Sequence, residues 1–136
     1  MIEILHGLFF TDIKNALKYE IYDKYNIKVV INCTSNYDFI NKDIKKIRLP
    51  FSHLMDQNDM QLLHNNLIKI LDTIRKYFLH KNILICCYDG KLISPLLIAL
   101  FIMKTGNIQY YDILKIFQSK KSDISLDYDL SQFKLN

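Results

Sequence analysis

The chain has 136 residues, of which 50% are hydrophobic and 24% are charged, a balance typical of a globular domain. The net charge of +4 comes from dispersed lysines, which argues against a nucleic-acid partner. No apolar run is long enough to span a bilayer, and an odd cysteine count with two adjacent cysteines does not fit a secreted disulfide framework. We therefore expect a single domain over residues 1–136 that is intracellular and cytoplasmic and has no membrane partner.

Apolar periodicity divides the chain into alternating strands and helices. Strands are expected at 1–5, 27–32, 44–49 and 83–86, and helices at 12–23, 60–79, 92–104, 108–118 and 126–135. Thr11 is expected to cap the first helix, and Gly106 to end the third in a left-handed conformation. Cys33 is interpreted as a buried packing residue. This order predicts an α/β fold with a central, mostly parallel sheet flanked by helices, and a functional site at the carboxyl edge of that sheet.

One stretch of the sequence carries candidate chemistry. A β-branched strand ends at Cys86 and Cys87, a short loop follows around Gly90, and an apolar helix begins near Leu92. A strand that turns directly into a helix points backbone N–H groups at one spot and adds the positive end of the helix dipole. A thiol at the mouth of such a turn is stabilised as a thiolate and can act as a nucleophile.

This stretch resembles the phosphate-binding loop of the cysteine-dependent dual-specificity protein phosphatases, whose signature is His-Cys, five residues, Arg, and Ser or Thr. The resemblance implies a phosphate loop made of Cys87, Tyr88, Asp89, Gly90, Lys91, Leu92, Ile93 and Ser94. Within it, Cys87 matches the nucleophile and Ser94 the final hydroxyl. Two positions depart from the signature, because Cys86 occupies the position of the family's histidine and Ile93 occupies the position of its arginine.

The missing arginine bears directly on catalysis. In the family it clamps two phosphate oxygens, through charge-assisted hydrogen bonds of roughly 1.5–3 kcal/mol each. Losing about 3–5 kcal/mol of transition-state binding slows a reaction on the order of a thousandfold or more. Arg48 and Arg75 are not expected at the loop, since one falls in a strand and the other in a helix. Lys91 is expected to point outward.

The resemblance also implies a general acid in the loop that precedes the long helix. The family's spacing favours Asp56, whereas ungapped continuation of the sequence places His53 at that position, and Asp59 is a third candidate. Asp56 and Asp59 have an alternative reading as the cap of the helix that follows. The sequence leaves these readings open.

Three functions follow from these residues. The leading hypothesis is a pseudophosphatase, catalytically impaired or inactive, that binds a protein partner such as a phosphoprotein. The alternatives are a weakly active phosphatase that uses Cys87, Asp56 and Lys91, and a phosphopeptide-binding module that uses the loop backbone alone. A vicinal disulfide between Cys86 and Cys87 is a further redox reading. No metal-ligand spacing is visible, so no metal or cofactor is expected.

Overall fold

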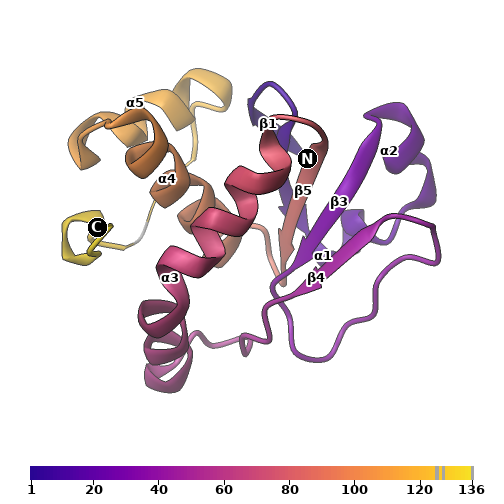
Figure 1. Cartoon of the computed structure of the whole chain (residues 1–136), viewed down its shortest axis with the longest axis horizontal. Coiled ribbons are helices and arrows are strands. Elements are labelled where there is room, and N and C mark those ends of the chain that lie inside the picture. Colours follow the sequence, from indigo (N-terminus) through magenta and orange to yellow (C-terminus); the bar gives the residue numbers. More distant parts are fainter. Residues whose placement is uncertain (125, 127, 136) are drawn as a thin grey trace.

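A five-stranded sheet in the order β1-β2-β5-β3-β4 forms the centre of the computed structural model, which describes residues 1–124, 126 and 128–135 (Figure 1). The strands are β1 (Ile2–Leu5), β2 (Leu8–Asp12), β3 (Ile27–Asn32), β4 (Lys45–Arg48) and β5 (Asn82–Cys87). Strand β1 runs antiparallel to β2, and the remaining neighbours are parallel. The predicted α/β class, with a mostly parallel sheet, is confirmed.

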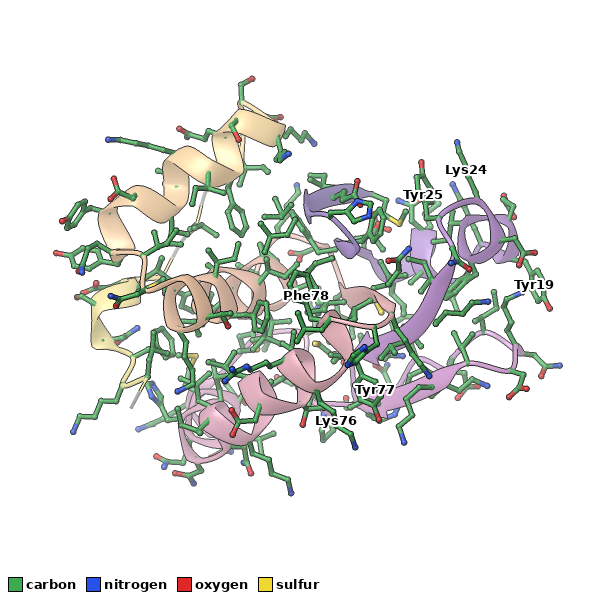
Figure 2. All side chains as sticks on the ribbon, turned by 45° about the horizontal axis from the view of Figure 1, so that its top comes forward. Tyr19, Lys24, Tyr25, Lys76, Tyr77 and Phe78 are labelled. Carbon is green, nitrogen blue, oxygen red and sulfur yellow. The ribbon has the colours of Figure 1, made fainter. Side chains whose placement is uncertain are left out.

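Helices cover both faces of this sheet. They are α1 (Ile13–Ala16), α2 (Tyr19–Lys24), α3 (Gln57–Phe78), α4 (Ile93–Gly106), α5 (Tyr110–Lys120) and a 3₁₀ turn, η1 (Leu130–Gln132). Helices α3, α4 and α5 lie on one side of the sheet, and α1 and α2 lie on the other (Figure 1). Phe78 points from α3 toward α4, where its ring centroid is 5.3 Å from that of Phe101 (Figure 2). No helix in the described ranges combines the length and hydrophobicity that a membrane span requires.

The helix predicted over 12–23 is confirmed as two short helices, α1 and α2, but the predicted cap and the missing strand before it need correction. Leu8–Asp12 is strand β2, which lies between β1 and β5, and Thr11 is a buried strand residue rather than a cap. Asp12 caps α1 instead, because its carboxylate accepts the N–H of Asn15 at 2.8 Å. A strand that is buried on both faces reads as a continuous apolar run rather than alternating apolar and polar residues, so the sequence did not indicate a strand here.

Two predictions near the carboxyl end of the chain also need correction. Gly106 is the last residue of α4, and the left-handed position is Asn107, with φ of 51°. Asparagine tolerates this conformation better than other residues with a side chain, apart from aspartate. The helix expected over 126–135 is only the 3₁₀ turn η1, capped by Asp129, and residue 127 lies outside the described residues.

The four parallel strands end at one edge of the sheet. Their last residues are Asp12, Asn32, Arg48 and Cys87. The loops that follow β3, β4 and β5 therefore meet at this edge, which is where ligands bind in open α/β sheets.

Candidate functional site

Cys87 and Ser94 meet at the junction between β5 and α4. Cys87 is the last residue of β5, and Ser94 lies in the first turn of α4. Their Sγ and Oγ atoms are 3.1 Å apart, and both residues are buried. The turn between them thus brings together the two polar groups that the sequence placed in one loop. A hydroxyl at this distance can donate a hydrogen bond to a thiolate.

The loop between them is pressed against the end of β2 at Gly90. The φ of Gly90 is +69°, a conformation that residues with a side chain rarely adopt. A Cβ atom added there would lie 2.8 Å from the backbone nitrogen of Asp12 and 3.0 Å from the carbonyl carbon of Thr11. Only glycine therefore fits, and the tight turn of the loop depends on it.

Asp89 turns its carboxylate back into this loop. Its Oδ1 atom accepts the backbone N–H of Lys91 at 2.8 Å and lies 3.9 Å from Sγ of Cys87. A loop that holds a phosphate needs its backbone N–H groups for the phosphate oxygens. Here one of those N–H groups is taken by an anion that belongs to the chain itself.

Little space remains in front of the thiol. The cavity there has a volume of about 10 Å³, and Met55, Leu92 and Ile93 supply its apolar walls. A cavity needs roughly 10–15 Å³ by this measure to hold a single water molecule. In this conformation the depression in front of the thiol is too small to enclose a phosphate group.

Ile93, at the family's arginine position, belongs to the hydrophobic core. It is the first residue of α4, is only 2% exposed, and packs in the cluster on the α3 side of the sheet. Its side chain offers neither charge nor hydrogen-bond donor to the loop. Ile93 therefore serves as a packing residue of the core.

No lysine or arginine of the described residues lines the cavity in front of Cys87. The guanidinium of Arg48 donates to the carbonyl oxygens of Thr34 at 2.7 Å and Tyr37 at 2.8 Å. Arg75 lies on α3 and lines a different cavity. Lys91 is exposed and lines a third, together with Lys121 and Asp123.

Tyr88 ties together the three loops at this edge of the sheet. Its hydroxyl accepts the backbone N–H of Ser35 at 3.1 Å. It lies 2.9 Å from Oδ1 of Asn36 and 3.1 Å from the carbonyl oxygen of Phe51, either of which can take its proton. The sequence analysis did not find this role, because the partners lie 37 to 53 residues away and share no local pattern with Tyr88.

The three candidates for general acid lie in two different places. Asp56 and Asp59 form a capping box at the start of α3, in which each carboxylate accepts the other residue's backbone N–H at 3.0 Å. Burial raises the pKa of Asp59, but hydrogen bonds from Ser52 and from the Asp56 N–H outweigh it and hold that pKa below its usual value. His53 lines the small cavity instead, with its ring centroid 5.1 Å from that of Tyr88. Catalysis by Asp56 therefore stays a prediction, and its carboxylate serves as a cap.

Cys33 and Cys86 are buried thiols with raised pKa values. Burial raises the pKa of Cys86 to about 12, and it raises that of Cys33 well above the usual value. Cys33 is fully buried, as predicted for a packing residue. Cys86 and Cys87 are free cysteines that pack into clusters on opposite faces of the sheet. Within the described part of the chain, no three His, Cys, Asp or Glu side chains are grouped to hold a metal ion.

Comparison with known proteins identifies the family. The model for the catalytic domain of dual specificity phosphatases matches residues 8–133. The chain therefore belongs to the dual specificity phosphatase family. A search of curated proteins gives no significant match.

Solved structures of this family share the fold. A crystal structure of DUSP15 has a TM-score of 0.81 and 16% sequence identity, covering 96% of this chain and 81% of that one. Human DUSP28 has a TM-score of 0.74 and 11% identity over 93% of this chain and 87% of that one. A human tyrosine phosphatase-like serine/threonine/tyrosine-interacting protein has a TM-score of 0.71 and 20% identity over the same shares, 93% and 87%.

Proposed function

We propose that this member of the family is a pseudophosphatase, a catalytically inactive domain that works by binding a protein partner. The observation that carries the proposal is the burial of Ile93 in the core at the position of the phosphate-binding arginine. Without that arginine, the loop lacks the paired donors that stabilise a transferring phosphoryl group.

The surroundings of the thiol add to this loss. The carboxylate of Asp89 lies 3.9 Å from Sγ of Cys87, so a phosphate dianion placed at the thiol would meet a negative charge. The cavity of about 10 Å³ would also have to open before any phosphate could enter. These features oppose phosphopeptide binding by the loop as well as catalysis.

Several features of the scaffold are nevertheless retained. The family's fold, the glycine turn at Gly90 and the Cys87–Ser94 pair all persist in this chain. One structural relative is described as phosphatase-like and as an interacting protein, which fits a binding role for this fold. We expect a protein partner, and a phosphoprotein is one candidate. An intracellular, cytoplasmic location stays part of the proposal.

Turnover of a small aryl phosphate, and of phosphotyrosine and phosphothreonine peptides, tests the proposal. An active dual specificity phosphatase serves as the positive control, and Cys87→Ser as the negative one. We expect the wild-type chain and Cys87→Ser to be equally inactive. Turnover within about tenfold of the active enzyme, abolished by Cys87→Ser, would overturn the proposal; about tenfold corresponds to only 1.4 kcal/mol of transition-state stabilisation.

A further inference from the structure

An apolar groove runs between strand β4 and helix α3, away from the cysteine loop. Its volume is about 310 Å³, and it shares no lining residue with the cavity in front of Cys87. Ile47 and Leu49 form one wall and Leu62 and Ile70 the other, and each packs in the same hydrophobic cluster. Ile47, Leu49 and Leu62 are only partly buried, so the groove presents apolar surface that the chain itself leaves uncovered.

The groove borders an unpaired strand edge. Strand β4 is the last strand of the sheet and pairs only with β3 among the described residues. The N–H of Leu49 bonds to the carbonyl oxygen of Asn32 at 2.9 Å. Because donors alternate in direction along a strand, the N–H groups of Lys46 and Arg48 face away from β3. These outward N–H groups can donate hydrogen bonds to the backbone of another strand.

The charges around the groove have one sign. Lys69 lines it, as does Arg48, whose guanidinium donates to the carbonyl oxygens of Thr34 and Tyr37, and of the described residues no acidic side chain lines it. Lys45 and Lys46 are exposed on β4 itself. Asp72, on the same helix as Lys69, lines a different cavity. The rim is therefore complementary to an acidic ligand.

We propose that the β4 edge and this groove bind an extended segment of a protein partner in which apolar and acidic side chains alternate. Such a segment would add a strand beside β4, using main-chain hydrogen bonds for affinity. Its apolar side chains would enter the groove on the α3 side, and its carboxylates, on the opposite face of the added strand, would lie near Lys46 of β4. The inference rests on the proposed function, because it names the surface by which the domain binds a protein.

A synthetic peptide of alternating valine and glutamate, labelled for fluorescence anisotropy, tests this surface on the full chain. A valine–lysine peptide and a peptide with the glutamates grouped at one end are the controls. We expect saturable binding of the alternating valine–glutamate peptide only, weakened by added salt. Lys46→Glu should weaken it about tenfold through charge reversal, whereas Arg75→Glu on α3 should change it little.

Amide hydrogen exchange supplies the second readout. Peptide binding should slow exchange at the amides of Lys46 and Arg48, the two that face outward from β4. Absence of saturable binding, protection confined to other elements, or equal effects of Lys46→Glu and Arg75→Glu would overturn the inference. Dimerisation that protects β4 without peptide would also overturn it, because a second copy would then occupy the edge.

The two proposals fail in different ways. Phosphatase turnover that depends on Cys87 would overturn the proposed function and leave the peptide result untouched. Loss of peptide binding would overturn the docking surface while the loop remained inactive.

Discussion

The carboxylate of Asp89 lies 3.9 Å from the thiol of Cys87 and accepts the N–H of Lys91. The loop that binds an external oxyanion in this family therefore has an internal anion at the thiol. Under the proposed function, two separate features oppose phosphate binding: the lack of a cation at buried Ile93 and the carboxylate of Asp89 beside the thiol. Adding a cation alone, or removing the carboxylate alone, should not restore phosphate binding.

The double variant Ile93→Arg with Asp89→Ala should bind orthovanadate, whereas neither single variant should do so saturably. The arginine provides paired donors, and removing the carboxylate frees a backbone N–H and space at the thiol. Isothermal titration calorimetry measures this directly. Tight binding by Ile93→Arg alone would show that Asp89 does not obstruct the loop.

Replacing Gly90 by alanine should destabilise the domain by at least about 1 kcal/mol, because a side chain at positive φ is strained and the added Cβ would meet the backbone of β2. Gly106→Ala is the matched control. Its Cβ would meet only the Ile108 side chain, at 3.2 Å, and alanine is the better helix former. Denaturant unfolding should separate the two variants, and an equal effect of both would contradict this account of the turn.

The variant Tyr88→Phe should lose about 1–3 kcal/mol of stability, because it keeps the ring but leaves the Ser35 N–H and its neighbours without the hydroxyl. Amide exchange at Ser35 should accelerate in the variant. Tyr37→Phe removes a hydroxyl from the neighbouring ring and should have a smaller effect on both measurements. Unchanged exchange at Ser35 in Tyr88→Phe would show that the hydroxyl does not hold these loops together.

Stability should depend on pH through Asp59. Its folded-state pKa is lowered, so its stabilising effect is complete above the unfolded-state pKa of about 3.9 and disappears as the pH falls through the lower folded-state value. Asp59→Asn should cost about 1–2 kcal/mol at pH near 7. The gap between wild type and variant should close below about pH 4. Unfolding curves across this range test it, with exposed Asp72→Asn as the control. A stability difference between wild type and Asp59→Asn that widened as the pH fell would contradict this account.

The sequence predicted the parts of the fold whose signals are local. The β-branched run of β3, the long amphipathic pattern of α3 and the strand–turn–helix around Gly90 each depend on neighbouring residues, and each was found. Strand β2 was missed because a short apolar run buried on both faces does not alternate. Its place in the sheet depends on pairing with β5, which is distant in sequence.

The candidate site also has parts that the sequence predicts and parts that only the fold brings together. Cys87, Gly90 and Ser94 follow from a local motif, and so does the absence of arginine at Ile93. The inward turn of Asp89 depends on a single side-chain rotamer that no sequence pattern encodes. Nor does the sequence indicate that Tyr88 bonds to the loops after β3 and β4, because such contacts exist only once the parallel strands are aligned.

Calorimetric titration of the purified wild-type chain with orthovanadate tests the central claim most directly, since vanadate resembles the transferring phosphoryl group and needs no turnover to be detected. With Ile93 in the core and Asp89 at the thiol, we predict no saturable heat of binding, and the same trace for Cys87→Ser. Saturable micromolar binding by the wild-type chain that Cys87→Ser abolishes would contradict the claim that this loop no longer holds an oxyanion.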